Sequence, residues 1–330
     1  MKYCQDKDCE TYWDEENPES NCQCGNPNYK KCEYYIGERT GESEEPSANE
    51  VDTETLFLPW HSNAMGSLDA EWINSKRQPF IIGVVGNAEA GKSTLLANLY
   101  MLMRNGKNIG DYAFSGSYTL LGWERLAHFL SFHTHKRVSF PPHTSSNNAR
   151  IPGLLHLLLK DKNGQFQDVL FTDAPGEWFT NWSDIADADE SKGAKWINEN
   201  ADAFIIVADS KAFNESQSKA RPLFRIVSRM RDTHNMRPTA LVWAKSDISI
   251  DAQIKAVISE KIITQLPNTQ TYDVAVINHD SEDLSLNVLK LVNQLLTEQY
   301  DKKNELPEIA ISNPNDFFFT IRLDSYARKK

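Results

Sequence analysis

The chain has 330 residues and a formal net charge of −11 at pH 7, and residues 1–54 hold 15 of the 46 acidic side chains but only 5 of the 35 basic ones. Because the remainder is nearly neutral and has no basic patch, we expect no nucleic-acid partner. No apolar run reaches the roughly 18 residues that cross a bilayer, and the N-terminus lacks a signal-peptide pattern, so we expect a cytoplasmic protein with no transmembrane segment.

Residues 1–36 form a head that contains all five cysteines of the chain. In a reducing compartment such clustering favours a metal site over disulfides, and four thiolates can close a tetrahedral Zn²⁺ site. Free thiols on a disordered acidic arm are the competing interpretation. We predict a structural Zn²⁺ held by Cys4, Cys9, Cys24 and Cys32, with Cys22 as the alternative ligand.

The length suffices for one large domain besides this head. Residues 37–78 indicate an acidic linker and docking segment, and residues 301–330 form a tail. Between them, over 79–300, apolar runs alternate with helical patterns, which predicts an α/β domain with a mostly parallel six-stranded sheet. Asn163-Gly164 is a hairpin signal, so one edge strand should run antiparallel. We expect strands at 80–85, 154–160, 168–172, 203–208, 239–243 and 274–277, and helices at 92–103, 183–198, 216–232, 251–265 and 282–299.

The segment GNAEAGKST matches the phosphate-binding pattern G-x-x-x-x-G-K-[ST]. A buried strand precedes it and a helical pattern follows, which is the context that a phosphate loop requires. Backbone N–H groups and the helix N-terminus would face the phosphates, Lys92 would reach the β- and γ-phosphates, and Ser93 would offer a hydroxyl to Mg²⁺. The predicted nucleotide-binding residues in this loop are Gly86, Asn87, Ala88, Glu89, Ala90, Gly91, Lys92, Ser93 and Thr94.

Two further motifs follow predicted strands. Asp173 and Gly176 form a D-x-x-G pattern, which suits a carboxylate that holds Mg²⁺ through water and a glycine N–H that meets the γ-phosphate. Lys245 and Asp247 follow a later strand and have the chemistry to select guanine. The lysine stem would lie along the base, and the carboxylate would accept from guanine N1–H and N2–H₂, which adenine does not offer together.

These three motifs, in this order, resemble the translation-factor-related (TRAFAC) class of GTPases over about residues 79–300. The resemblance implies a Ras-like P-loop NTPase fold that binds GTP or GDP with Mg²⁺. More narrowly, the segments SGSYTLLGWE, PPHTS, GLLHLLL and DAPGEWF are similar to the bacterial double-GTPase family of the second class, found in GTPase-associated conflict systems. That likeness implies a nucleotide-controlled switch that works with a protein adaptor or effector, in settings such as defence against phage. One departure is Ala244, where the guanine motif usually opens with Asn or Thr.

The resemblance places the first switch in the long insert 105–153. There we predict that Thr144 offers its hydroxyl to Mg²⁺, with Ser145 and Ser146 close enough to leave the assignment open. Glu177 occupies the position where many small GTPases have a water-positioning glutamine. A carboxylate there could orient water or act as a base, or it could repel the γ-phosphate. The candidate catalytic residues are therefore Lys92, Thr144 and Glu177.

The leading hypothesis is a GTP-hydrolysing switch of low turnover that controls protein partners. In this hypothesis three aromatic residues beside the D-x-x-G motif, Trp178, Phe179 and Trp182, form an exposed partner surface. The other interpretation has them packed back on the sheet. Two alternative functions stay open, which are a nucleotide-sensing interaction module with little turnover and an ATPase, the latter because of Ala244.

Overall fold

The computed structural model describes residues 2–4, 35–38, 60–74, 77–130, 153–185, 191–276 and 282–298. The chain divides into two compact units, Met1–Leu56 and Phe57–Lys330. In the first unit, β1 (Lys2–Cys4) pairs antiparallel with β2 (Tyr35–Glu38). Among the described residues, no three histidine, cysteine, aspartate or glutamate side chains gather into a metal-binding group. The zinc site stays a prediction, because four of its candidate ligands lie outside the described residues: Cys9, Cys22, Cys24 and Cys32.

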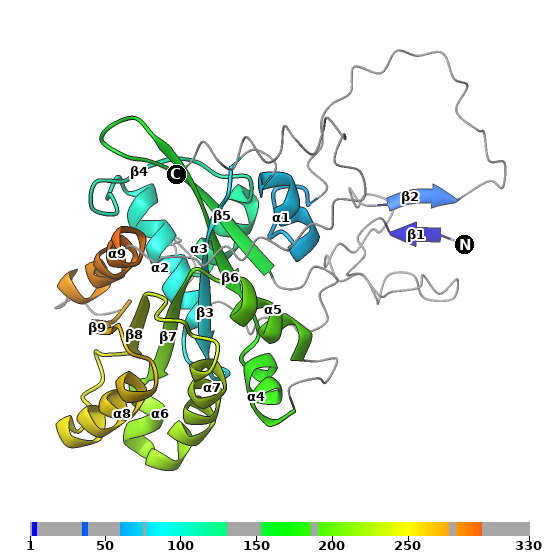
Figure 1. The fold of residues 1–330 in the computed structure, drawn as a ribbon. Coiled ribbons are helices and arrows are strands. Elements are labelled where there is room, and N and C mark those ends of the chain that lie inside the picture. The colour runs from blue at the N-terminus through cyan, green and yellow to red at the C-terminus, as the bar shows by residue number, and fades with distance from the viewer. Residues whose placement is uncertain are drawn as a thin grey trace, which may run out of the picture. The chain divides into compact units, whose positions relative to one another are not determined.

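Within the described residues of the second unit, seven strands form one sheet in the order β4-β5-β6-β3-β7-β8-β9 (Figure 1). The five strands from β6 to β9 run parallel, whereas β5 is antiparallel to both of its neighbours. Strands β7 and β8 are buried along their whole length, as a sheet covered on both faces requires. The strands are β3 (Phe80–Gly86), β4 (Ala113–Gly116), β5 (Gly153–Lys160), β6 (Phe166–Asp173), β7 (Ala203–Asp209), β8 (Thr239–Ala244) and β9 (Thr269–Val274).

Helices cover both faces of this sheet. Successive strand residues point to opposite sides, so the apolar strands present apolar side chains on both faces, and each face packs against its own set of helices. On one face, α2 (Lys92–Arg104), α3 (Leu120–Leu130) and α9 (Glu282–Thr297) form a hydrophobic cluster with Val84 of β3. On the other, a second cluster includes Val85 of the same strand. Its helices are α4 (Gly176–Asp184), α5 (Lys192–Asn200), α6 (Ser210–Glu215), α7 (Arg221–Arg231) and α8 (Ala252–Gln265). A short 3-10 helix, Gln217–Ala220, connects α6 to α7.

The end of the predicted docking segment packs on the outer strands. Trp60 and α1 (Ser67–Asn74) form a third hydrophobic cluster with Leu154 of β5 and Leu170 of β6. The indole of Trp60 also donates a hydrogen bond to the carbonyl of Tyr118 at 2.7 Å. Residues 60–74 therefore pack on the sheet through a hydrophobic cluster of their own, to which β5 and β6 contribute.

Three predictions about the elements are corrected. The sheet has seven strands among the described residues instead of six, because β4 lies inside the insert and pairs with β5, which is therefore not an edge strand. The single helix expected at 183–198 is two helices, α4 and α5. The last strand is Thr269–Val274 instead of 274–277, because this edge strand, TQTYDV, is mostly polar and lacks the continuous apolar run that the prediction required.

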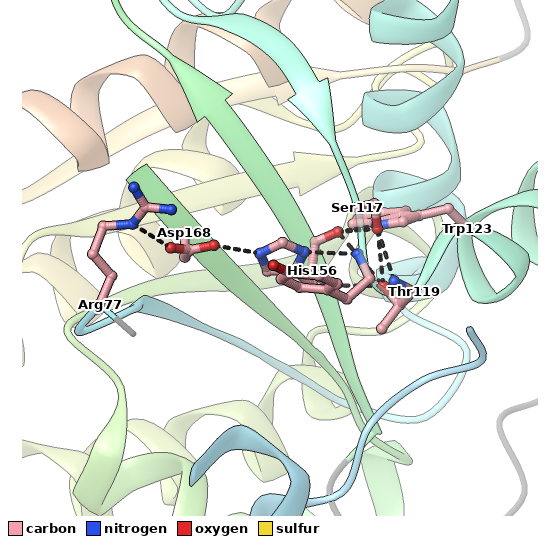
Figure 2. A network of polar contacts seen from close by, with 7 residues as sticks. Arg77, Ser117, Thr119, Trp123, His156 and Asp168 are labelled. Carbon is pink, nitrogen blue, oxygen red and sulfur yellow. Dashed lines mark hydrogen bonds and ion pairs between the residues drawn. The ribbon is translucent and has the colours of Figure 1, made fainter. Parts of the chain in front are cut away.

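A buried polar network fixes the start of the insert on the β5–β6 hairpin, as Figure 2 shows. The backbone N–H of Tyr118 donates to Nδ1 of His156 at 2.9 Å, so the ring proton lies on Nε2, which donates to Asp168 at 2.9 Å. Arg77 donates to the other oxygen of Asp168 at 2.7 Å. Ser117 and the indole of Trp123 donate to the carbonyl of His156, at 2.6 and 2.8 Å. The network thereby ties α3 to the hairpin that ends in Asp173.

No helix in the described part of the chain is long and apolar enough to cross a membrane.

Candidate nucleotide-binding site

The predicted phosphate loop connects the end of β3 to the start of α2. Gly91, at the N-cap of α2, has a φ of 101°, and Glu89 has a φ of 58°, so the backbone turns through the left-handed region twice. Glycine adopts such a conformation without the strain that a Cβ atom adds. No side chain caps α2, so the first helical turn, which includes Ser93 and Thr94, presents its backbone N–H groups to a bound anion. The loop therefore has the form of a phosphate site.

Lys92 turns back over this loop from the first position of α2. Its Nζ donates to the carbonyl oxygens of Gly86 and Asn87, at 3.2 and 2.9 Å. Burial lowers the pKa of Lys92 to about 8, although the charges of Asp173 and Glu177 act in the opposite direction. A buried ammonium group with incomplete compensation of its charge is stabilised by a bound anion. The environment of Lys92 therefore fits a phosphate group.

Ser93 and Asp173 meet beside the loop. The hydroxyl of Ser93 donates to Oδ1 of Asp173 at 2.8 Å. Burial raises the pKa of Asp173, while the Ser93 hydroxyl and the charge of Lys92 act to lower it. A divalent cation would compensate this buried carboxylate, and hydroxyl and carboxylate oxygens are ligands that suit Mg²⁺. The pair fits the predicted Mg²⁺ site, whereas the third predicted ligand, Thr144, lies outside the described residues.

Gly176 brings the start of α4 against the phosphate loop. A Cβ atom placed on Gly176 would lie 2.1 Å from the backbone nitrogen of Ala88 and 2.4 Å from the carbonyl carbon of Asn87. A glycine is therefore required at this contact. Glu177 follows in the first turn of α4 and is partly exposed. It is close enough to Lys92 for its charge to act against the lowering of the lysine pKa. The structure thus brings Glu177 near the phosphate loop.

The predicted partner surface of aromatic residues is wrong. Trp178, Phe179 and Trp182 are 6%, 1% and 4% exposed and belong to the hydrophobic cluster that α4 shares with α5 and α7. The D-x-x-G motif leads directly into an amphipathic helix, and these side chains form its apolar face. The other interpretation, that they pack back on the sheet, describes their placement.

Lys245 and Asp247 lie after β8, beside the phosphate loop. The Nζ of Lys245 donates to the carbonyl oxygen of Glu89 at 3.0 Å and to Oδ2 of Asp209 at 2.6 Å. Asp247 is exposed, two residues further along the chain. Ser246 holds this segment in place, because its N–H donates to the carbonyl of Val274 at 3.1 Å. The structure therefore brings the two predicted base-binding residues to the same edge of the sheet as the phosphate loop.

Sequence reasoning did not single out Asp209. It is the last residue of β7, where it lies opposite Ala244 in the parallel pairing with β8. Its position in the sequence could have indicated it. Both β6 and β7 end in an aspartate, and the carboxyl ends of parallel strands meet at one edge of the sheet. Asn87 also has a partner that the sequence did not indicate, because its Nδ2 donates to the carbonyl of Lys219 at 3.3 Å.

A sequence profile of the Double-GTPase 2 family matches residues 80–300. The chain belongs to this family. It is a P-loop GTPase of the double-GTPase type, as the resemblance had implied. No curated protein matches the sequence. Among solved structures, the chain is similar to Methanosarcina barkeri Roco2 RocCORdC bound to GDP, with 16% sequence identity, a TM-score of 0.36, and coverage of 66% of this chain and 50% of that chain. The chain spans about half the length of that Roco structure.

Proposed function

We propose that this GTPase is a molecular switch that binds and hydrolyses GTP and controls protein partners. The observation that carries the proposal is the meeting of its three motifs at one edge of the sheet. Ser93 of the phosphate loop bonds to Asp173, Gly176 touches the same loop, and Lys245 reaches the loop carbonyl of Glu89. Phosphate, metal and base would each meet residue types with the chemistry to hold them.

On the phosphate side, the proposed role of Lys92 is to exchange its two loop carbonyls for the β- and γ-phosphate oxygens. Ser93 and Asp173 would hold Mg²⁺, the serine directly and the aspartate through water. A bound Mg²⁺ would supply positive charge to the phosphate oxygens. On the base side, the stem of Lys245 would lie along guanine and the exposed carboxylate of Asp247 would accept from N1–H and N2–H₂.

For hydrolysis, the proposed role of Glu177 is to orient the attacking water or to accept its proton. Its position supports this role, since it is one residue from the glycine that touches the loop and close enough to affect Lys92. Positioning and charge stabilisation are the main protein contributions to phosphoryl transfer. We propose a low intrinsic turnover, with Lys92, Glu177 and Thr144 as the catalytic residues.

The switching element in this proposal is α4. Its first residue, Gly176, contacts the phosphate loop, while its apolar face is buried in the core with α5 and α7. A γ-phosphate that displaces Gly176 must therefore move side chains that other helices pack against. This gives a route from nucleotide state to the surface of α5 and α7, where a protein adaptor or effector would detect the change.

The test is a titration of the full chain with GTP and with ATP in Mg²⁺, with phosphate release measured in the same samples. Selective GTP binding with slow release that a partner accelerates is the expected result. Tight GTP binding without phosphate release would favour the first alternative, a nucleotide-sensing module with little turnover. Equal affinity for ATP would favour the second alternative, an ATPase, which Ala244 supports because it stands where the guanine motif usually has an Asn or Thr side chain.

Two parts of the proposal rest on sequence alone. A Zn²⁺ site in the cysteine head would give the acidic N-terminal unit a recruiting role, and metal analysis of the purified chain tests it. A role in bacterial defence against phage follows only from the resemblance to conflict-system GTPases. Loss of protection in cells that carry a Lys92→Ala variant would test that role.

A further inference from the structure

The base-binding loop of this chain lacks a common support. Ala244 stands where an Asn or Thr side chain usually ties the loop to the phosphate loop, and its methyl group makes no hydrogen bond. Ala244 is nevertheless close to the phosphate loop, since its Cβ lies 3.6 Å from where a Cβ atom on Gly91 would be. The described part of the chain supplies a side-chain hydrogen bond between the two loops through Lys245, which donates to the carbonyl oxygen of Glu89 at 3.0 Å.

Lys245 is itself held by Asp209. The ammonium group lies 2.6 Å from Oδ2 of Asp209, and only 11% of that aspartate side chain is exposed. The lysine side chain is 36% exposed, so solvent screens part of the attraction, but a hydrogen bond between two charged groups is still stronger than a neutral one. Lys245 also has a φ of 59°, a backbone conformation that a lysine adopts only when its surroundings hold it there.

Asp209 has a fixed position of its own. It ends β7 opposite Ala244, and its Oδ1 accepts a hydrogen bond from the backbone N–H of Ala212 at 3.0 Å. One carboxylate oxygen is therefore anchored to α6, and the other is directed at Lys245. Asp209 thereby holds the otherwise flexible side chain of Lys245 in a fixed position at the edge of the sheet.

We propose that Asp209 is the positioning residue for guanine recognition, and that it compensates for the amide that Ala244 lacks by holding Lys245 across the phosphate loop. The inference rests on the guanine-nucleotide binding proposed above. Asp209 acts through the lysine stem on the base, away from the γ-phosphate. Its loss should therefore weaken GTP and GDP by the same factor and leave the rate of hydrolysis at saturating GTP unchanged.

The test compares Asp209→Ala with the wild-type chain by calorimetric titration with GTP, GDP and ATP in Mg²⁺. We expect the affinities for GTP and GDP to fall together by about 10- to 100-fold, the range for loss of a hydrogen bond to a charged group. The affinity for ATP should fall less, so the preference for guanine narrows. Asp209→Asn keeps one oxygen that can accept a hydrogen bond, so its affinities for GTP and GDP should lie between those of the wild-type chain and of Asp209→Ala.

Asp202→Ala is the matched control. Asp202 is a buried carboxylate that immediately precedes the other end of β7. It is 6% exposed, and its Oδ2 accepts from the backbone N–H of Ile81 at 2.9 Å. It should lower the melting temperature and leave the nucleotide affinities within about twofold. Equal losses of affinity in the two variants would reduce Asp209 to a structural residue and overturn the inference.

Further outcomes separate this inference from the proposed function. A wild-type chain that prefers GTP, together with an unaffected Asp209→Ala variant, would overturn the inference alone. A wild-type chain with no preference for guanine would overturn the proposed function and the inference with it. Adding Ala244→Asn to Asp209→Ala should recover GTP affinity, and a double variant that binds no better would refute the compensation.

Discussion

Gly176 lies so close to Ala88 that a Cβ atom on the glycine would be 2.1 Å from the alanine backbone nitrogen. A Gly176→Ala variant must therefore separate the start of α4 from the phosphate loop. We expect GTP affinity to fall more than GDP affinity, and phosphate release to slow by about 10-fold or more, because the γ-phosphate site is disturbed. Stopped-flow binding of both nucleotides and single-turnover hydrolysis measure these effects.

Gly116→Ala is the control for that change. Apart from its two chain neighbours, no described residue has an atom within 4 Å of where a Cβ on Gly116 would be, and Gly116 does not have a positive φ, so an alanine fits there without strain. Equal effects of the two variants on nucleotide binding would show that the contact between Gly176 and Ala88 has no special role.

Glu177→Gln tests whether the carboxylate takes part in hydrolysis. The glutamine keeps the shape of the side chain but cannot accept a proton, so we expect phosphate release at saturating GTP to slow by about 10- to 100-fold. GDP affinity should stay within about twofold, since Glu177 would face the γ-phosphate. Faster release in the variant would instead mean that the carboxylate repels the γ-phosphate.

Asp247→Asn tests base selection. An amide donates where the carboxylate accepts, so we expect GTP affinity to fall by about 10- to 100-fold and affinity for xanthosine triphosphate, whose C2 carries an acceptor oxygen, to rise. Competition of GTP, xanthosine triphosphate and ATP against labelled GDP gives the three affinities. An unchanged ratio of GTP to ATP affinity would contradict the guanine-binding role of Asp247 and favour an ATPase.

Asp168→Asn should destabilise the fold without a direct effect on the nucleotide. Burial acts to raise the pKa of Asp168, but the hydrogen bonds from His156 and Arg77, together with the charge of Arg77, hold it below its usual value. Loss of the buried carboxylate should lower the free energy of unfolding by about 2 kcal/mol. The exposed ion pair of Asp111 and Lys162 supplies the control, because solvent screens it and Asp111→Asn should change the free energy of unfolding much less in the same urea titration.

His234 should make stability depend on pH. Burial, and then the charge of Arg237, lower the pKa of His234 from 6.5 to about 4. The unfolded chain therefore binds an extra proton below pH 6.5, so the stability that this group contributes at neutral pH is lost as the pH falls from about 6.5 to 4. The total is about 3 kcal/mol, and urea unfolding at several pH values should show a flatter profile for His234→Gln.

The phosphate loop and the parallel strands could be predicted because their signals are local. A glycine-rich turn between an apolar strand and a helix has few other structural solutions, and the strands beside it are continuous apolar runs. The expected hairpin was also local, since Asn163-Gly164 forms its turn and Gly164 has a φ of 83°.

Other features depend on partners far away in the chain. Strand β4 is short and half exposed, and it is a strand only because it pairs with β5. The hydrogen bond between His156 and the Tyr118 backbone, like the ion pair of Asp209 and Lys245, joins residues from separate elements. No periodicity in the sequence marks such pairs. The aromatic residues of α4 were misjudged for the same reason, because their burial depends on where α5 and α7 lie.

Two ammonium groups share the carbonyl oxygens of the phosphate loop. Lys92 holds those of Gly86 and Asn87, and Lys245 holds that of Glu89. Two internal cations thus help to hold the shape of the loop, and in the proposed mode of binding only Lys92 would change partners when phosphate arrives. Little conformational entropy is then lost on binding, so nucleotide capture should be limited by diffusion and by release of the Lys92 contacts, without a slow folding step of the loop.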